Sequence, residues 1–600
     1  MKQSLLSPLV ALALGSAAWT TPAFAQYPID QEAYIKSPLP TMDGNFGRCV
    51  AMSGTTLVVG SARWNPSVPG VVHVYEQVNG VWVHQTALQH PSPDGNDRFG
   101  FSVATDGDLI VVGASGDDSS SAGTLGDPTN NSLTDSGAAV VFARGGGYWS
   151  QVAYLKASSP DIDDEFGHSV AVHGDTIVVG AHLEGSVHPD SGAAYVFVGN
   201  GTSWSQQAFL KASDPFWYHR FGAAVAIDQD SVVIGAWQHT IGGFATGAAY
   251  VFKRTGTTWA EEAFLTGSNS DDYDQFGRAV DISGDCILVA APTEGSFGTG
   301  VNGDQTQHVG AELGAVYVFE HVAGAWTQSA YVKPNLIDPQ DRFGNSVAIA
   351  DRRFVVGATS EDSGSMGING QPDDASASAS GAAYYFTPEG ASWRQEAYIK
   401  SSNTDAGDSF GQAVDLHGNH LAVGGHGESS AAPGLNGDQS DNSLPGAGAV
   451  YLFDLHAPMA NFCGVPEPNS SGYPAAISMA GSLVVADGDF TLHATSLPQG
   501  EFGFFLNSPG QGFVPNPGAS QGHLCLGGGQ AIGRHNRPHE ILHSGISGAF
   551  SLHLDLSDMP TTTLPAAVAA GETWNFQAWF RDTNPGSTSN FTDGLSVTFE

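Results

Sequence analysis

A Phe-Gly pair occurs seven times in this chain of 600 residues, each time followed by two apolar segments and a segment like Gly-Ala-Ala-Tyr-Val-Phe. Successive pairs are separated by 53, 67, 55, 55, 67 and 67 residues. A repeat period above about 40 residues, with four strand signals in each unit, is typical of β-propeller blades. We therefore predict an all-β fold in which the repeats form a seven-bladed β-propeller. The pairs begin at Phe46, Phe99, Phe166, Phe221, Phe276, Phe343 and Phe410.

The third unit illustrates how one repeat forms a blade. Residues 166–173 read as a first strand, and Gly174-Asp175 is a tight-turn dipeptide. Residues 176–181 are almost continuously apolar, as is typical of a strand that is buried on both faces. Residues 192–197 and 204–211 follow as a third and a fourth strand. Each unit therefore predicts one four-stranded antiparallel sheet.

The fourth strands are distributed unevenly along the chain. Six of them lie between units and begin with a Trp, and the seventh unit has none after Phe453. A spare copy, Ala33-Tyr34-Ile35-Lys36, stands ahead of the first Phe-Gly pair. We predict that this N-terminal strand completes the last blade, which closes the ring and hides its edges. The recurring aromatic residues are expected to be core, including Trp82, Trp149, Trp204, Trp259, Trp326 and Trp393.

The repeat unit resembles the FG-GAP repeat of the integrin alpha-chain propeller, and especially its bacterial secreted variants. The resemblance rests on the order Phe-Gly, Ser-Val-Ala-Val, Val-Val-Gly-Ala and Gly-Ala-Ala-Tyr-Val-Phe, and it covers about residues 30–456. It implies a seven-bladed propeller, extracellular placement, and a role in adhesion or ligand binding.

One part of the family pattern is missing. Several integrin blades carry a calcium loop of the form D-x-D-x-D-G-x-x-D between the first two strands. Here the links are as short as Ser53-Gly54, residues 106–108 and residues 283–285, which supply too few oxygen ligands for Ca²⁺. We therefore predict no cofactor and no metal-binding residue, and leave a Ca²⁺ dependence of another kind open.

The chain begins with the pattern of a cleaved secretory signal. Lys2, an apolar run and Ala23-Phe24-Ala25 occupy residues 1–25, and no later stretch is long and apolar enough to span a bilayer. The domains are predicted as a signal peptide (1–25), the propeller (26–457) and a C-terminal all-β sandwich-like domain (461–600). The protein is expected to be secreted or held at the cell surface.

The C-terminal region has its own features. Stretches at 463–472, 522–527 and 574–582 resemble a module that recurs in exported planctomycete and myxobacterial proteins. Cys463 and Cys525 both lie there and are a candidate disulfide, because exported proteins meet an oxidising environment. Cys49 and Cys286 lie in propeller strands and are expected to be buried and unpaired.

The charge of the chain restricts its partners. Sixty acidic residues against 21 basic ones give a formal net charge of −39. Such a surface repels nucleic acid and anionic membranes, so the expected partner is an extracellular protein or a glycan. The sequence leaves the oligomeric state open.

The longer repeats suggest a binding surface. Links on one face of the ring are short and links on the other are long, so the loop-rich face is the predicted binding surface. Four units carry an insertion 24 residues after the Phe, expected to project as a short turn. These insertions are predicted to be surface loops with turn chemistry, and a cation or glycan site is the alternative. Its candidate residues are Asp127, Asp304, Asp373 and Asp438.

Enzyme motifs are weak in this sequence. Two matches to G-x-S-x-G, at Ser409 and Ser520, lack the strand-turn-helix context of a nucleophile, so no catalytic residue is predicted. The predicted function is non-enzymatic binding or adhesion through the loop-rich face. The alternative is a secreted polysaccharide hydrolase or lyase, for which a pair of carboxylates confined to one or two blades would be the evidence.

Overall fold

The computed structural model of the chain divides into two compact units, one of Ile29–His456 and one that contains Ala457–Glu600. The structure describes residues 29–62, 68–124, 126–201, 203–306, 312–336, 338–390, 392–455, 461–462, 470, 475–481, 485, 490–514, 524–527, 532–537, 540–545, 548–561, 566–569, 572–582, 588–592 and 594–599. The predicted signal peptide lies outside these residues. Among the described residues, no helix has both the length and the apolar character needed to cross a bilayer.

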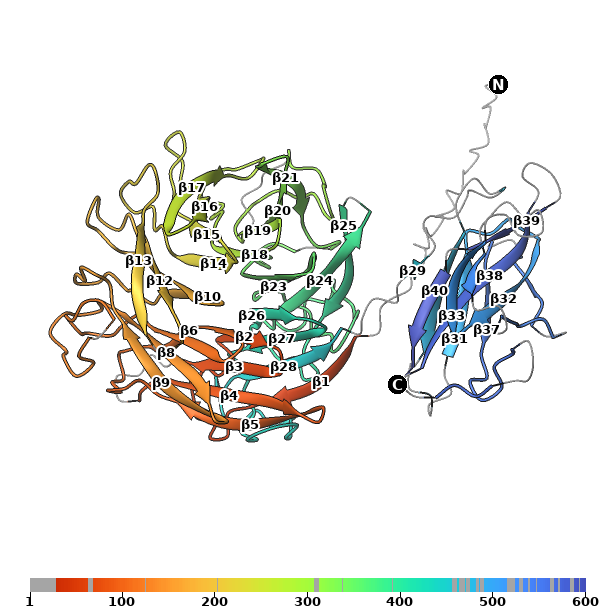
Figure 1. Cartoon of the computed structure of the whole chain (residues 1–600), viewed down its shortest axis with the longest axis horizontal. Helices are drawn as coiled ribbons and strands as arrows, with labels where there is room; N and C mark the ends of the chain where they lie inside the picture. Colours follow the sequence, from red (N-terminus) through yellow and green to blue (C-terminus); the bar gives the residue numbers. More distant parts are fainter. Residues whose placement is uncertain are drawn as a thin grey trace, which may run out of the picture. The chain divides into compact units, whose positions relative to one another are not determined.

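The first unit consists of seven four-stranded antiparallel sheets arranged around a common axis (Figure 1). We number the sheets in chain order of their inner strands. The strands are β2 (Cys49–Ser53), β3 (Thr56–Ser61), β4 (Val71–Val78) and β5 (Val81–Leu88); β6 (Phe99–Asp106), β7 (Leu109–Ala114), β8 (Ala138–Gly145) and β9 (Tyr148–Leu155); β10 (Ser169–His173), β11 (Thr176–Ala181), β12 (Ala193–Gly199) and β13 (Trp204–Leu210); β14 (Ala224–Asp228), β15 (Ser231–Ala236), β16 (Ala248–Thr255) and β17 (Thr258–Leu265); β18 (Ala279–Ser283), β19 (Cys286–Ala291), β20 (Ala315–Val322) and β21 (Ala325–Val332); β22 (Ser346–Ala350), β23 (Arg353–Ala358), β24 (Ala382–Glu389) and β25 (Ser392–Ile399); and β26 (Phe410–His417), β27 (His420–Gly425), β28 (Ala449–Asp454) and β1 (Asp30–Ile35).

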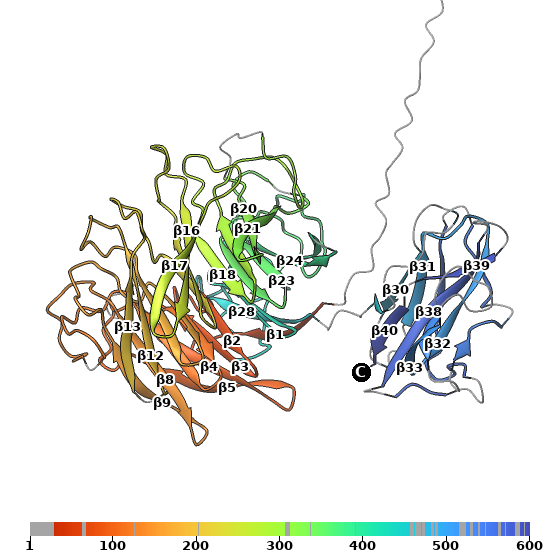
Figure 2. The same cartoon turned by 45° about the horizontal axis from the view of Figure 1, so that its top comes forward.

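The inner strands form a closed circuit, because β2, β6, β10, β14, β18, β22 and β26 each contact the next and β26 contacts β2. In Figure 1 the outer strands β5, β9, β13 and β17 lie along the rim. The N-terminal strand β1 pairs antiparallel with β28, and Phe46 bridges to Gly448. The prediction of an all-β propeller closed by an N-terminal strand is confirmed. Figure 2 shows the sheets fanning around the ring, with tight hairpins such as β8–β9 at their lower ends.

The Phe-Gly pair joins each sheet to the one before it. Phe166 is fully buried and packs with residues of both the second and the third sheet. Gly167 has a φ of +90°, and a Cβ on it would lie 2.1 Å from the carbonyl oxygen of Ala138 in β8. Only glycine combines this backbone conformation with so close an approach. The repeat is therefore a packing unit of the ring.

The tryptophans of the outer strands divide into two groups. Trp82, Trp204 and Trp393 are buried, as expected. The other three, Trp149, Trp259 and Trp326, are partly exposed, so the prediction that all six are core residues is wrong. Their indole N–H groups donate to side chains on the outer strand of the preceding sheet, at Gln85, Gln207 and Glu262. A partly exposed position suits tryptophan, since its ring is apolar and its N–H is polar.

The second unit is a small β-sandwich. A sheet of seven strands and one of three share a core that includes Met479, Leu492, Phe505, Phe576 and Val597. Cys463 and the side chain of Cys525 lie outside the described residues, so their pairing stays a prediction. The strands are β29 (Asn461–Phe462), β32 (Phe502–Ser508), β35 (Gly533–Arg534), β36 (Leu542–His543), β38 (Thr573–Asp582), β39 (Thr588–Phe591) and β40 (Gly594–Thr598); β30 (Ala476–Gly481), β31 (Phe490–Thr495) and β37 (Phe550–His553); and the separate pair β33 (Gly510–Val514) and β34 (Leu524–Gly527).

Candidate functional site on the propeller axis

The four insertions fold back along the rim of the ring. The prediction that they project from it is wrong. Asn302, Asn369 and Asn436 exchange hydrogen bonds with the outermost strand of their own sheet. In each case the backbone N–H of Asn donates to a Tyr carbonyl, at 2.7 Å, and the Asn side-chain oxygen accepts the N–H of the same Tyr. The insertions therefore cover an otherwise open strand edge.

The four predicted binding aspartates lie on the insertions of four different sheets, and all are exposed. Asp127, Asp304 and Asp438 each accept hydrogen bonds from the N–H and hydroxyl of the residue two positions later. Such bonds are typical of Asx turns. In the sixth unit, Gln371 occupies the position that is equivalent to these aspartates, and Asp373 lies two residues later. The structure gives three of these aspartates a local turn role, and their binding role stays a prediction.

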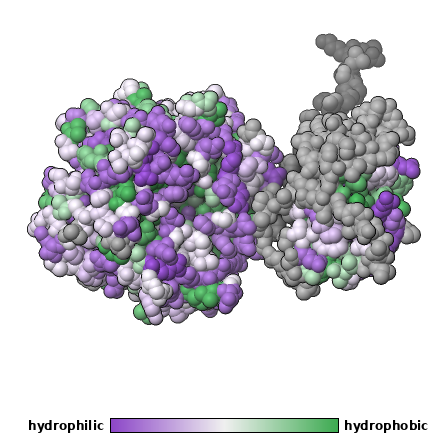
Figure 3. Space-filling view, viewed as in Figure 1, coloured by the Kyte–Doolittle hydropathy of each residue, from purple (hydrophilic) through white to green (hydrophobic). Residues whose placement is uncertain are grey.

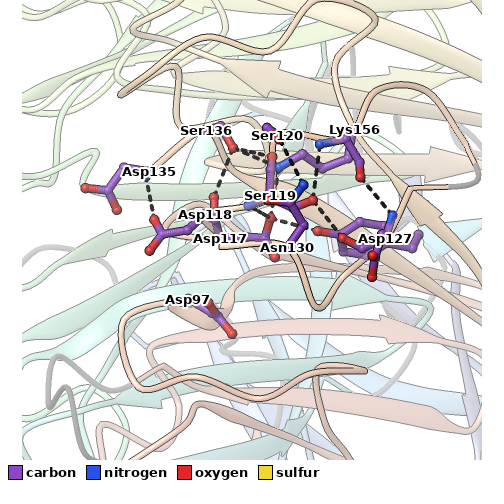
Figure 4. Close-up of polar contacts among 12 residues, drawn as sticks. Asp97, Asp117, Asp118, Ser119, Ser120, Asp127, Asn130, Asp135, Ser136 and Lys156 are labelled. Carbon is purple, nitrogen blue, oxygen red and sulfur yellow. Dashed lines mark hydrogen bonds and ion pairs between the residues drawn. The ribbon is translucent and has the colours of Figure 1, made fainter. Parts of the chain in front are cut away.

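Beneath each insertion lies a buried ion pair. In the second sheet Lys156 Nζ lies 2.8 Å from Asp117 Oδ1, and Ser136 Oγ and the Tyr154 hydroxyl complete the cluster (Figure 4). His90 is on the other side of Asp117, 3.2 Å from its Oδ2. Every member is buried, which fits a structural role and excludes direct contact with a large ligand. Equivalent pairs are Lys36–Glu428, Lys333–Glu294 and Lys400–Glu361.

An aspartate two residues before the Phe recurs in five units and caps a turn. In each unit its carboxylate accepts the N–H of the residue three positions earlier, as Asp274 does from Asp271 at 2.6 Å. This confirms the sequence interpretation of a turn cap. Burial raises the pKa of each of these carboxyls to about 7, namely Asp97, Asp164, Asp274, Asp341 and Asp408.

A different set of side chains gathers around the axis of the ring, at the end with the long loops. They come from three positions of the repeat: the residue before the Phe, the residue after the Gly, and the residue after the second strand. The residue before the Phe has a positive φ of 50° to 59° in all seven units, although none of the seven is glycine. We call the following residues the axial cluster: Arg48, Phe101, Glu165, His168, His182, Trp237 and Arg278.

A chain of contacts links the cluster across the sheets. The guanidinium carbon of Arg48 lies 5.1 Å from the ring centre of Phe101, which lies 5.0 Å from the ring of His168. The rings of His168 and His182 are 3.7 Å apart. The guanidinium of Arg278 lies 5.8 Å from the ring centre of Trp237. Side chains of the first five sheets therefore meet at one place.

The chain as a whole is acidic, and hydrophilic residues are the most frequent on the propeller face that Figure 3 shows, but arginines gather at the axis. Desolvation by the surrounding blades lowers the pKa of Arg48, and desolvation together with the positive charge of Arg48 lowers that of Arg278. Desolvation also lowers the pKa of both His168 and His182, with further contributions from nearby arginines. Positive charge is therefore concentrated at the axis.

Glu165, His168 and His182 form a compact group within the cluster. His168 Nδ1 lies 3.3 Å and His182 Nδ1 lies 3.9 Å from Glu165 Oε2. Arg98 donates to the other carboxylate oxygen, Oε1, at 2.8 Å. One ligand atom from each of the three residues can lie within 4.8 Å of the other two, a spacing that could hold a metal ion.

Two further carboxylates, Asp281 and Asp415, lie on inner strands at the same position of the repeat, which is alanine in the other five sheets. Asp281 accepts the N–H groups of Ile282 and, in the next sheet, Ile349. Asp415 likewise accepts N–H groups of its own strand and of Met52 in the first sheet, at 2.9 and 2.5 Å. Burial raises the pKa values of these carboxyls to about 7 and about 6. Because both oxygens of each bind backbone amides, these carboxylates join adjacent sheets.

The sequence interpretation did not identify the axial cluster. Its members are scattered singly along the chain, and in any one unit they look like ordinary surface residues. One signal was available: the residue after the Phe-Gly pair varies among the units, whereas the pair itself is constant. Those residues are Arg48, Phe101, His168, Ala223, Arg278, Asn345 and Gln412.

A comparison with protein-family models agrees with this fold. The FG-GAP repeat model matches residues 82–142, 149–197, 204–252, 259–319 and 393–453, so the chain carries FG-GAP repeats between residues 82 and 453. Each matched segment starts at or beside a fourth strand and ends in the third strand of the next sheet. No curated protein matches. A solved structure from Bacteroides fragilis, named as a candidate 6-phosphogluconolactonase, is similar at a TM-score of 0.36 and 12% identity, over 59% of this chain and 83% of that one.

Proposed function

We propose that this protein is exported and binds a protein or glycan ligand without catalysing a reaction, and that the ligand presents anionic groups to the propeller axis. The observation that carries the proposal is Arg278. No described carboxylate pairs with it, whereas Arg98 and Arg220, which stand nearby, pair with Glu165 and Asp190.

The physical argument concerns like charges. Arg48 lowers the pKa of Arg278 through its positive charge, so the two guanidinium groups repel one another in the absence of a ligand. A carboxylate, sulfate or phosphate placed between them would remove this repulsion and accept charge-assisted hydrogen bonds. The repulsion therefore favours an anion-bound state.

Exposed aromatic side chains on the same loop-rich face support a glycan as ligand. Phe216, Trp217 and Tyr218 are consecutive in the link between the third and fourth sheets and are 55, 52 and 53% exposed. The indole N–H of Trp217 donates to His188 Nδ1 at 3.1 Å, which orients its ring. Large exposed apolar groups of this kind usually mark a contact surface. We propose that they stack on the faces of sugar rings.

The alternative of a polysaccharide hydrolase or lyase has no specific observation in its favour. Asp281 and Asp415 are a pair of carboxylates confined to two sheets, but both oxygens of each accept hydrogen bonds from backbone amides, which fits a structural role. We therefore propose a binding protein of the integrin alpha-chain type with seven blades. We propose no Ca²⁺ requirement, and we assign the C-terminal module to retention at the cell surface or to export.

The test is a glycan array that includes uronic-acid and sulfated glycans, probed with the mature chain at two salt concentrations. Binding is expected to favour anionic glycans and to weaken as salt rises, because salt screens exposed charges. Arg278→Gln should lower the affinity at least about tenfold, as expected for losing a hydrogen-bonded charge pair. Arg254→Gln is the matched control, because Arg254 also stacks on a tryptophan, Trp259, but lies at the other end of the sheets and pairs with Asp230.

Two results would contradict the proposal. One is equal loss of binding in the Arg278 and Arg254 variants, which would indicate a general effect of charge or folding. The other is turnover of a polysaccharide by the pure protein, which would support the hydrolase or lyase alternative.

A further inference from the structure

We propose that Glu165, His168 and His182 bind a divalent transition-metal ion of the Zn²⁺ class at the propeller axis. This inference does not depend on the nature of the ligand proposed above. The group comes from one sheet only: Glu165 precedes Phe166, His168 follows Gly167, and His182 follows β11.

The distances suit such an ion. Zn²⁺ binds imidazole nitrogen and carboxylate oxygen at about 2.0–2.2 Å, so two ligand atoms of a tetrahedral site lie roughly 3.3–3.5 Å apart. His168 Nδ1 and Glu165 Oε2 are 3.3 Å apart, within this range. His182 Nδ1, at 3.9 Å from the same oxygen, needs only a small side-chain shift to complete the set.

A second, independent observation points to a ligand at this place. His182 is more than nine-tenths buried, and its Nδ1 atom has no hydrogen-bond partner although it faces Glu165. Leaving a buried polar nitrogen without a hydrogen-bond partner destabilises the folded state. Coordination of a metal ion by Nδ1 would remove that destabilisation.

The donor set selects the class of metal. Two imidazoles and one carboxylate suit Zn²⁺, Co²⁺, Ni²⁺ or Fe²⁺, whereas Ca²⁺ and Mg²⁺ prefer sites made of oxygen atoms. The residues therefore match the chemistry of a transition metal, and the absence of an integrin-type calcium loop does not bear on them.

The neighbouring charges define what the bound ion would do. Arg98 holds Oε1 of Glu165 and so fixes the orientation of Oε2. Partners of this kind usually strengthen a metal site. Arg220 and Arg278 add positive charge near His168, which weakens the affinity for a cation and favours an anion as a further ligand. With three protein ligands, a tetrahedral ion keeps one position open for that anion.

Packing does not require this trio, because the other sheets have different residues at the same three positions. The closest counterpart is the seventh sheet, where His426 follows β27 as His182 follows β11. Its Nδ1 is also buried and unpartnered, but Ser409 and Gln412 stand where Glu165 and His168 stand in the third sheet. The chain thus contains its own control site.

The experiment uses the full mature chain, freed of metal with a chelator and titrated with Zn²⁺ by calorimetry and with Co²⁺ by visible absorption. The wild-type protein is expected to bind both ions, and bound Co²⁺ should give the visible absorption of an imidazole-coordinated ion. His168→Gln and His182→Gln should each weaken binding at least about tenfold, as removal of a ligand costs more than removal of its supporting partner. His426→Gln should bind like wild type. A thermal melt without metal checks that each variant is folded.

A readout without variants covers the case in which a substitution prevents folding. In wild type, Zn²⁺ should protect His168 and His182 from an imidazole-modifying reagent, as mapped by mass spectrometry, and should leave His426 as reactive as before. The inference is overturned if wild type binds neither Zn²⁺ nor Co²⁺. It is also overturned if the protected or required histidines lie elsewhere, for example at His535 in the second unit.

Discussion

The closure of the ring by its N-terminal strand leads to a quantitative prediction about one buried ion pair. Lys36 follows β1, and its Nζ is hydrogen-bonded to Glu428 in the seventh sheet, with both side chains essentially inaccessible to solvent. The backbone oxygen of Lys36 accepts the hydroxyl of Tyr75 from the first sheet at 2.9 Å. This residue therefore joins both sides of the closure.

The perturbation is Lys36→Met, which keeps an unbranched apolar stem of similar length and removes the charge. Glu428 would keep its bonds from the Tyr34 hydroxyl at 2.8 Å and from Asn403 at 3.1 Å, but would lose its counter-ion in a buried place. Removing one partner of a buried pair costs about 3–5 kcal/mol of unfolding free energy. The double variant with Glu428→Gln should recover most of that loss, because no isolated charge then remains.

The matched control is Lys333→Met in the fifth sheet. Lys333 Nζ lies 2.7 Å from Glu294, which also accepts the Tyr331 hydroxyl, so the local chemistry is the same. The fifth sheet, however, is formed by one continuous segment and does not close the ring. Both variants should lose similar free energy in urea denaturation followed by tryptophan fluorescence.

The two variants should differ in where the protein opens. Hydrogen exchange followed by mass spectrometry should show faster exchange in β1 and β28 for Lys36→Met than for wild type. For Lys333→Met, exchange in these two strands should stay close to the wild-type rate. A loss below about 1 kcal/mol, or unchanged exchange in β1, would refute the reasoning that a buried charge pair holds the ring closed.

Three further predictions follow from single residues. Gly167→Ala should destabilise the propeller by several kcal/mol in chemical denaturation, since its Cβ would lie 2.1 Å from the Ala138 carbonyl oxygen. Gly174→Ala is the control, because Gly174 has a positive φ but open space around it, and it should cost only about 1 kcal/mol. Equal costs for the two variants would be inconsistent with the packing argument. Burial raises the pKa of Asp274 from 3.8 to about 7, so the folded state keeps a proton that the unfolded state releases, and stability should fall as pH rises from about 4 to about 7. Because Asp97, Asp164, Asp341 and Asp408 are shifted in the same way, Asp274→Asn should reduce this slope in thermal melts without abolishing it, and a slope equal to that of wild type would argue against the prediction. Burial raises the pKa of the Cys286 thiol to about 12, so a thiol-alkylating reagent at pH 8 should modify it only after unfolding, and rapid modification of the native protein would count against its burial.

Most of the propeller could be predicted from the sequence, because each repeat carries its own strand and turn signals. The closing strand was also predictable, since Tyr34-Ile35-Lys36 copies the end of the internal fourth strands such as Tyr398-Ile399-Lys400. Those two segments make the same bonds, to an insertion and to a buried glutamate. The sequence pattern of the closing strand and its hydrogen bonds in the structure therefore indicate the same fold.

The environment of side chains on the outer strands could not be predicted in the same way. Trp149 and Trp204 occupy the same place in the repeat, yet the first is partly exposed and the second buried. Trp149 donates its indole N–H to Gln85 of the preceding sheet at 2.7 Å, whereas the indole nitrogen of Trp204 is buried without a hydrogen-bond partner. The same limit applied to the insertions, whose Asn-Gly turns were identified but whose pairing with the rim was not.

The axial cluster lay beyond sequence interpretation for a geometric reason. In a ring of sheets, residues at one repeat position converge from all sides, so neighbours in space are separated by whole repeats in the chain. Arg48 and Phe101 are in contact, and so are Phe101 and His168, although 53 and 67 residues separate them. A motif search within one unit can detect at most Glu165, His168 and His182, and not their neighbours Arg48, Phe101 and Arg278 from other units.

This geometry also explains why a site can arise at the axis at little cost to folding. Gly167 must stay glycine because a backbone oxygen lies against it, and its equivalents are constant throughout the seven units. The next residue along has no such restriction, and it is Arg48, His168 and Arg278 in three of the units. Packing thus fixes one position and leaves its neighbour free to take up charge or metal ligands. Constancy of the Phe-Gly pair therefore reports the fold, and variation directly beside it identifies where a ligand is to be sought.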